Sequence, residues 1–232
     1  MLININGQHN YSSSEEFYKK QCETFATHLL LSDNNMLLPI EEISLNLTPD
    51  PFTSRIPSIQ YWPNYGQLIA GSYVASITTG GCLPYGDIDI YFKSCADVQN
   101  FVSLNALKMI NEVSEEFVCS YTVVDGIKLN LIWGIKFDGP NDLLSAFDIR
   151  CCAIAYCPVD KKLFQVEGCV NDIATKQIVF NPCPRGTTIN RLVKYIEKGY
   201  KIDKYQRLFF AELIRSEKYN PILEATTGYK GE

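Results

Sequence analysis

Two aspartates near the middle of the chain have a spacing that suits metal chemistry. Residues 87–92 read DIDIYF, an alternation that predicts a β-strand with Asp87 and Asp89 on one face. Two carboxylates so close together repel each other, and a cation between them relieves the repulsion. Hard oxygen ligands favour Mg²⁺ or Mn²⁺. The pattern therefore predicts a divalent-metal site, although a lone Asp-x-Asp is more often a solvated strand face.

A glycine–serine pair precedes these aspartates. Gly71 and Ser72 stand between two apolar stretches, residues 68–70 and 73–75. Glycine allows the backbone to approach a phosphate closely, and serine adds a hydroxyl and an N–H donor. On its own the dipeptide is more often an ordinary turn. Followed by an Asp-x-Asp strand, it predicts a phosphate-binding turn beside a metal site.

The combination resembles the nucleotidyltransferase superfamily that is typified by DNA polymerase beta. Its members carry a Gly-Ser or Gly-Gly motif, a short spacer, and a strand that reads hydrophobic-Asp-hydrophobic-Asp-hydrophobic. Gly71, Ser72, Asp87 and Asp89 match this pattern, whereas Gly86 occupies the first hydrophobic position. The resemblance implies an α+β fold, with a mixed β-sheet core flanked by helices, and metal-dependent transfer of a nucleotidyl group.

A site with two metal ions usually needs a third carboxylate. In the superfamily this acid lies on a neighbouring strand, and the expected position here holds Asn130, which cannot act as a base. A second candidate is Asp148, where the chain resembles a branch of the superfamily found in viral and other large genomes. Two interpretations of Asp148 stay open. It is either a catalytic acid and metal ligand, or a capping residue paired with Arg150 or another base.

Basic residues gather in the C-terminal part of an otherwise acidic chain. The net charge is −5, yet residues 185–207 hold seven basic and two acidic residues. Arg191, Lys194, Lys198 and Lys201 recur every three or four positions, which on a helix produces one basic stripe. In this basic segment, too, the chain resembles the branch of the superfamily that is found in viral and other large genomes. We expect Lys194 and Lys198 to contact nucleotide phosphates, with a solvated helix face as the alternative.

Composition restricts the class of protein. With 46% hydrophobic and 20% charged residues, the chain is typical of globular proteins. It has no apolar run near the roughly 18 residues of a membrane span and no signal-peptide pattern, so we expect a cytoplasmic protein without a membrane partner. Nine cysteines at irregular spacing predict reduced, mostly buried thiols. With only two histidines, Ser-His and Cys-His catalysis is disfavoured.

Periodicity divides the chain into three parts. Residues 1–66 are predicted to form an N-terminal helix, at about 12–31, and a long irregular segment that wraps the domain. Residues 67–167 are predicted to form the nucleotidyltransferase-like core, and residues 168–232 a helical C-terminal appendage. The core elements are expected as strands at 87–93, 117–124, 127–135, 148–156 and 162–166, a strand and turn within 68–75, and helices at 97–112 and 141–147. The appendage helices are expected to begin at 187–188 and near 204.

These observations lead to a metal-dependent nucleotidyltransferase as the first hypothesis. Mg²⁺ or Mn²⁺ on the aspartates would hold an NTP, and an acceptor oxygen would attack its α-phosphorus. The acceptor stays open among an RNA end, a protein hydroxyl and a small molecule. The alternative, which Asn130 favours, is a catalytically degenerate nucleotidyltransferase fold that binds nucleotide or RNA, or regulates. An RNA-binding adaptor that uses the basic segment is a third hypothesis.

Overall fold

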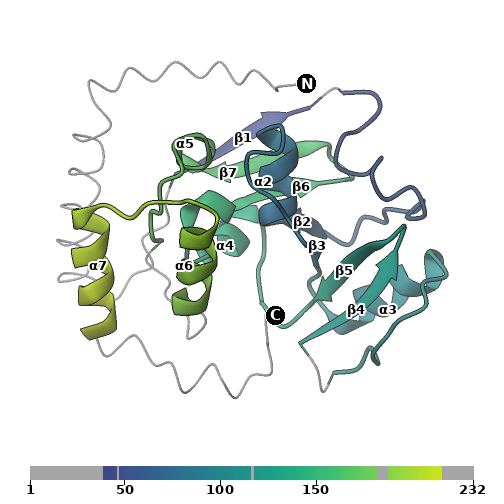
Figure 1. Cartoon of the computed structure of the whole chain (residues 1–232). Coiled ribbons are helices and arrows are strands. Elements are labelled where there is room, and N and C mark those ends of the chain that lie inside the picture. Colours follow the sequence, from purple (N-terminus) through teal and green to yellow (C-terminus); the bar gives the residue numbers. More distant parts are fainter. Residues whose placement is uncertain (1–38, 46, 116–117, 182–187, 216–232) are drawn as a thin grey trace.

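A single seven-stranded sheet forms the centre of the computed structural model, which describes residues 39–45, 47–115, 118–181 and 188–215 (Figure 1). The strand order is β1-β7-β6-β2-β3-β5-β4. β3 and β5 run parallel, and the other neighbouring strands run antiparallel. The strands are β1 (Ile40–Ser44), β2 (Leu68–Ala70), β3 (Asp87–Tyr91), β4 (Cys119–Val124), β5 (Ile127–Ile132), β6 (Ile154–Cys157) and β7 (Lys162–Val166).

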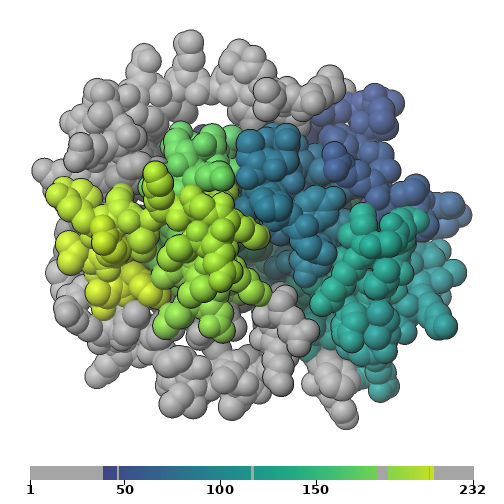
Figure 2. All heavy atoms as spheres, viewed as in Figure 1, coloured from purple at the N-terminus to yellow at the C-terminus, as the bar shows by residue number. Residues whose placement is uncertain are grey.

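Helices cover both faces of this sheet. The helices are α2 (Ser72–Thr78), α3 (Cys95–Leu104), α4 (Pro140–Ser145), α5 (Cys169–Thr175), α6 (Thr188–Glu197) and α7 (Lys204–Arg215). The larger apolar cluster joins one face to α2, α3 and α5, and the smaller joins the other face to α4. Figures 1 and 2 show α6 and α7 at one end of the molecule, and α3 with the β4–β5 hairpin at the other. No described helix is long and apolar enough to cross a bilayer.

The alternation predicted for the aspartate strand is confirmed. Ile88 and Ile90 are fully buried in the larger apolar cluster, and Tyr91 packs in the smaller one. Asp87 and Asp89 share the face of Tyr91 and are partly exposed. The fold class, an α+β arrangement with a mixed sheet and flanking helices, is confirmed as well.

The predicted hairpin also forms as expected. β4 and β5 pair antiparallel, and their register closes at Val124 and Ile127. Asp125 and Gly126 between them have φ angles of 52° and 78°. Two consecutive left-handed residues match the twist of the strands, and an Asp-Gly dipeptide adopts this geometry readily.

Tertiary contacts move several element boundaries away from the predictions. The helix expected at 97–112 ends at Leu104, since the Asn105 side chain bonds to the backbone of the irregular segment at Gln60 and Tyr61. The strand expected at 148–156 begins with a 3₁₀ turn at Arg150–Cys152 and continues as β6. β1 was not predicted, and α5 lies in the segment predicted to be helical although no helix was assigned to its residues. The N-terminal helix expected at 12–31 lies outside the described residues.

The described cysteines agree with the prediction of reduced thiols. All seven of them are free, and five are buried, as Cys151 and Cys152 illustrate. These two lie in the 3₁₀ turn rather than on opposite faces of a strand. They therefore act as small apolar side chains of the core.

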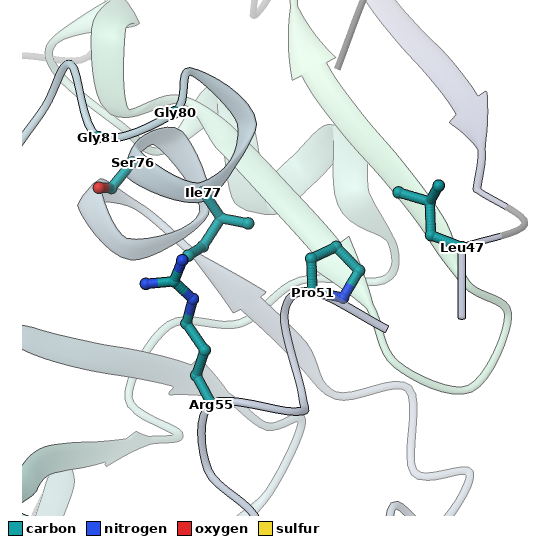
Figure 3. A pocket seen from close by; sticks show the side chains of 7 residues that line it. All are labelled: Leu47, Pro51, Arg55, Ser76, Ile77, Gly80 and Gly81. Atoms are coloured by element: carbon teal, nitrogen blue, oxygen red, sulfur yellow. The ribbon is translucent and has the colours of Figure 1, made fainter. Parts of the chain in front are cut away.

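A cavity of about 420 Å³ lies beside the C-terminal half of α2 (Figure 3). Arg55 from the irregular segment reaches toward Ser76 and Ile77 of the helix, and Gly80 and Gly81 close one side. Neither Gly71, Ser72 nor the β3 aspartates line this cavity. It is therefore separate from the motif that the sequence singles out.

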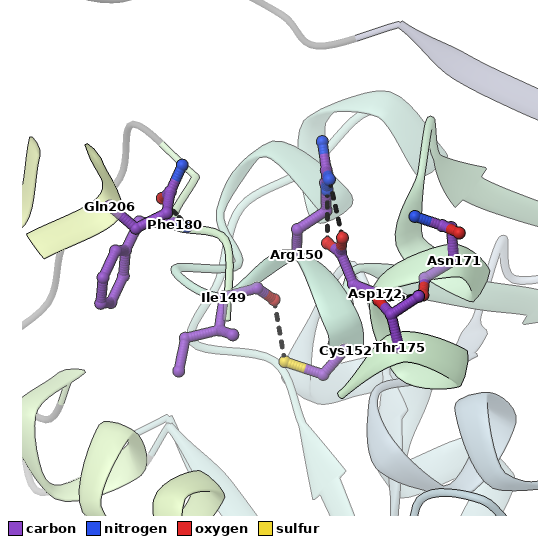
Figure 4. Close-up of polar contacts among 8 residues, drawn as sticks. All are labelled: Ile149, Arg150, Cys152, Asn171, Asp172, Thr175, Phe180 and Gln206. Atoms are coloured by element: carbon purple, nitrogen blue, oxygen red, sulfur yellow. Dashed lines mark hydrogen bonds and ion pairs between the residues drawn. The ribbon is translucent and has the colours of Figure 1, made fainter. Parts of the chain in front are cut away.

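A buried ion pair anchors α5 to the 3₁₀ turn (Figure 4). Arg150 Nε lies 2.6 Å and Nη2 2.8 Å from the two carboxylate oxygens of Asp172, and both side chains are almost fully buried. Gly168 has a φ of 84°, and a Cβ there would lie 3.0 Å from Arg150 Cζ. A glycine is therefore needed both for the backbone and for the space that the arginine takes.

We expect Asp172→Asn to lower the free energy of unfolding by about 3–5 kcal/mol, because it removes the carboxylate that pairs with the buried Arg150. The matched control is Glu42→Gln. Glu42 also lies 2.6 Å from its partner Lys162, but that pair is exposed. Solvent screens such a pair, so this variant should unfold close to wild type. Urea unfolding measures both. Equal losses in the two variants would contradict the assigned difference between buried and exposed pairs.

Candidate functional site

The two aspartates of β3 face an asparagine of β5 across the parallel strand pair. Asp89 lies opposite Asn130 in the register, and Asp87 lies opposite Lys128. Asn130 Nδ2 donates to Asp87 Oδ2 at 2.9 Å and to Asp89 Oδ1 at 2.8 Å. One amide group therefore bridges both carboxylates. The position at which the sequence predicts a third acid is indeed adjacent to the pair.

The electrostatics of this pair favour a proton or a cation. Burial and the nearby charge of Asp87 raise the pKa of Asp89 from 3.8 to about 7, although Asn130, Lys128 and Arg191 lower it in part. Near neutral pH, Asp89 is thus poised to exchange its proton for another positive charge. Carboxylate oxygens from two residues are hard ligands of the kind that Mg²⁺ and Mn²⁺ prefer. The donor set fits a divalent cation.

The glycine of the Gly-Ser pair lies beside one of the two aspartates. Gly71 follows β2 and precedes α2 with φ 88° and ψ −150°, a conformation that side chains rarely allow. A Cβ on Gly71 would lie 3.7 Å from Asp89 Oδ2 and 3.7 Å from Phe147 Cε1. The backbone thus runs directly beside the carboxylate. Ser72 follows as the first residue of α2, and its side chain is partly exposed.

The structure places Asp148 against α6. Its buried Oδ2 accepts hydrogen bonds from Thr188 Oγ1 at 2.5 Å, from Arg191 Nε at 2.9 Å and from Arg191 Nη2 at 2.8 Å. Asp148 is therefore paired with a base other than Arg150, which is one element of the second interpretation. In the described ranges, no three acidic, cysteine or histidine side chains gather as a metal-binding group.

The predicted phosphate-binding lysines lie on the exposed side of α6. Lys194 is exposed. Lys198 Nζ donates to the carbonyl of Pro84 at 3.3 Å, in the loop that leads into β3, and lies 5.4 Å from the centre of the Tyr195 ring. Three apolar residues of α6 are also about half exposed: Ile189, Val193 and Ile196. The lysines lie near the entrance to β3, but the structure records no contact between them and the aspartates.

Arg191 is a site residue that the sequence analysis did not single out. It was assigned only to the basic stripe, yet its charge acts on Asp89 and its guanidinium binds Asp148. Thr188 and Arg191 are three residues apart, so they share one face of α6. The sequence shows that a hydroxyl and a base share one face of this helix. It does not show that their common partner is Asp148, which lies 40 and 43 residues away in the chain.

Comparison with solved structures identifies the fold. A Thermotoga maritima CCA-adding enzyme complexed with tRNA is similar over 82% of this chain and 54% of that one, at 14% identity and a TM-score of 0.51. A tRNA-processing enzyme in an apo form is similar over 75% of this chain and 49% of that one, at 14% identity and a TM-score of 0.55. The chain thus spans about half the length of each neighbour. No family model and no curated protein matches.

Both of these neighbours belong to the superfamily of polymerase-beta-like nucleotidyltransferases. At this level of identity the likeness concerns the fold. The chain therefore has the nucleotidyltransferase fold that its Gly-Ser and Asp-x-Asp motifs predict.

The raised pKa of Asp89 predicts how the metal-free protein responds to pH. The folded state keeps a proton up to about pH 7 that the unfolded chain releases near 3.8. This contribution to stability is fully present below the unfolded value and is lost as the pH rises through about 7. Between these values, in EDTA, we expect the fall of unfolding free energy with pH to be shallower in Asp89→Asn than in wild type.

Chemical unfolding at several pH values measures this slope. Glu112→Gln is the control, because Glu112 is an exposed carboxylate of the segment between α3 and β4. It should keep the wild-type slope. An unchanged slope in Asp89→Asn would contradict the raised pKa.

Proposed function

We propose that the chain transfers a nucleotidyl group from an NTP to an acceptor in a reaction that depends on a divalent cation. The observation that carries this proposal is the meeting of the Gly71 backbone, the β3 carboxylates and Asn130 in one place. These groups come from three separate parts of the chain. A backbone that a phosphate can approach closely therefore lies next to two carboxylates that can bind Mg²⁺ or Mn²⁺.

Asp87 and Asp89 are the residues that would hold Mg²⁺ or Mn²⁺. When bound, the cation neutralises phosphate charge and orients the reacting groups. Asn130 supports this role, since rotation of its amide by half a turn would place the oxygen where the nitrogen now lies. Three oxygen-bearing side chains from β3 and β5 thus surround the site.

The remaining groups have simpler tasks. The Ser72 hydroxyl and N–H are donors for the phosphates, and Lys194 of α6 and Lys198 just after it supply positive charge. An acceptor oxygen attacks the α-phosphorus, the bond to the β-phosphate breaks, and pyrophosphate leaves. Such a reaction needs positioning and charge neutralisation more than covalent help. Asp148, predicted as a third catalytic acid, bonds instead to Arg191 and Thr188, which supports an indirect role.

An RNA end is the acceptor that the observations support best. The T. maritima neighbour is in complex with tRNA. Positive charge gathers in α6 and the segment after it, where four lysines are exposed: Lys194, Lys198, Lys201 and Lys204. Cations of this kind attract a phosphate backbone whatever its sequence. A protein hydroxyl or a small molecule would appear as a different labelled product in the same assay.

The second candidate function is a nucleotide-binding or RNA-binding module without catalysis. The observation that favours it is Asn130, whose amide already bridges both carboxylates without a cation. A module of this kind needs neither metal nor turnover. Metal binding and label transfer from an NTP therefore separate the two functions.

Asp87→Asn combined with Asp89→Asn should lower transfer of label from α-³²P-NTP to total RNA at least about a hundredfold. The double variant should also lose the rise in melting temperature that Mn²⁺ causes in wild type, because both ligands are gone. Its metal-free melting temperature should not fall, since the repulsion is removed. A matched variant, Glu112→Gln with Glu115→Gln, changes the same charge at two exposed positions. An equal Mn²⁺ effect in both double variants would rule out the metal site.

Asn130→Asp should lower the melting temperature of the metal-free protein and enlarge the rise caused by Mn²⁺. The substitution places a third carboxylate within hydrogen-bond distance of the other two, so repulsion grows without a cation and metal affinity grows with one. Asn100→Asp, the same change at an exposed position of α3, should show neither effect. If transfer appears only after Asn130→Asp, the wild-type chain is the non-catalytic module.

A further inference from the structure

We propose that Arg191 binds the phosphates of the nucleotide, and that the buried carboxylate of Asp148, together with Thr188, is the positioning device that holds Arg191 at the site. This inference rests on the proposed function, because it assigns residues to the same nucleotide site. It gives Asp148 a role through Arg191 rather than as a ligand of the cation.

The contacts of Asp148 fix the direction of the arginine. Asp148 is 3% exposed and Arg191 27% exposed. Nε and Nη2 of the guanidinium both bind Oδ2 of Asp148, at 2.9 and 2.8 Å, and Thr188 Oγ1 donates to the same oxygen. A planar guanidinium held through two of its nitrogens has little freedom to rotate. The partly exposed remainder of Arg191 therefore keeps one orientation.

The chain around Asp148 leads directly to the aspartate pair. The ring of the preceding residue, Phe147, lies 3.7 Å from the Cβ position of Gly71, and Asp89 Oδ2 lies 3.7 Å from that same position. Phe147 and Asp148 are consecutive residues, so the carboxylate that holds Arg191 follows directly on a ring that packs beside Gly71 and Asp89. Asp89 is one of the two residues that would hold the cation, which is where the phosphates of an NTP must lie.

The helix that carries Arg191 is anchored on both sides of this region. Thr188 and Arg191 tie its first turn to Asp148, and Lys198, just beyond its last residue, donates to the Pro84 carbonyl in the loop before β3. Tyr195 between them is buried in the larger core cluster. A basic side chain fixed in this way loses little conformational entropy when an anion binds. More of the interaction energy therefore contributes to the binding free energy.

The two roles of Asp148 have opposite consequences for metal binding. A metal ligand that becomes an amide weakens the binding of the cation. A positioning residue that becomes an amide leaves the cation in place and weakens the hold on phosphate. Separate measurements of Mn²⁺ binding and nucleotide binding therefore distinguish a metal ligand from a positioning residue. They also distinguish either role from a purely structural one.

The experiment uses the full chain and two probes. Mn²⁺ alone is followed by its effect on the melting temperature. For the second probe, ATP, GTP, CTP and UTP are titrated calorimetrically into wild type with Mn²⁺, and the tightest is compared with its nucleoside. Asp148→Asn, Arg191→Gln and the double variant are the test proteins. Arg207→Gln, an exposed arginine of α7, is the matched control.

We expect Arg191→Gln and Asp148→Asn to bind the NTP about tenfold to a hundredfold more weakly, since a charge-assisted hydrogen bond is lost. Nucleoside affinity should equal that of wild type and of Arg207→Gln, and the Mn²⁺ effect should be no smaller than theirs. The double variant should bind no more weakly than Arg191→Gln, because Asp148 acts through Arg191. Arg191→Lys retains a positive charge beside Asp148 and so tests the site in a protein that keeps this ion pair. It should lose part of the NTP affinity, because lysine lacks the planar guanidinium.

Three results would overturn the inference: loss of the Mn²⁺ effect in Asp148→Asn, NTP affinity of Arg191→Gln and Arg191→Lys within twofold of wild type, or equal loss of nucleoside affinity. Wild type that binds no NTP overturns the proposed function and this inference together. Wild type that binds NTP through Arg191 but transfers no label supports the inference and rejects the proposed catalysis.

Discussion

The repulsion between two carboxylates on one strand is the constraint around which this molecule is organised. Asp87 and Asp89 must share a face because successive side chains of a strand alternate. Burial and mutual charge raise the pKa of Asp89 to about 7, and the Asn130 amide offsets part of the cost by donating to both acids. Only a parallel pairing of β3 with β5 in this register brings Asn130 opposite Asp89. The register of the central sheet therefore places the amide that stabilises the two carboxylates.

The other groups at the site are placed by the same sheet. β2 ends beside Asp89, so the turn at Gly71 lies against the carboxylate, where a larger residue would require a rare backbone conformation. Beyond β5, the chain passes through α4 and returns at Phe147, next to Gly71. Asp148 then meets α6 and holds Arg191.

Local patterns were reliable where one short segment decides its own structure. Alternation in residues 87–92 and the Asp125-Gly126 turn both predicted what the structure shows. Predictions were wrong where a distant partner decides. The helix after Ser94 stops at Leu104, where the Asn105 side chain bonds to the backbone near residue 60. Residues 150–152 form a 3₁₀ turn in which Arg150 bonds with Asp172. β1 was missed since its strand character depends on pairing with β7.

By itself, the sequence determined the chemistry that this chain can offer: two carboxylates on one strand face, a glycine–serine turn before them, and an asparagine where an acid is expected. These follow from residue type and from periods of two or 3.6 residues, which act over a few neighbours. Only the tertiary structure decided the partners. Asp148 and Arg191 are 43 residues apart, and nothing in either segment reveals that they meet. Their contact exists because packing of the sheet and α6 brings two distant segments together, and such packing depends on the whole chain.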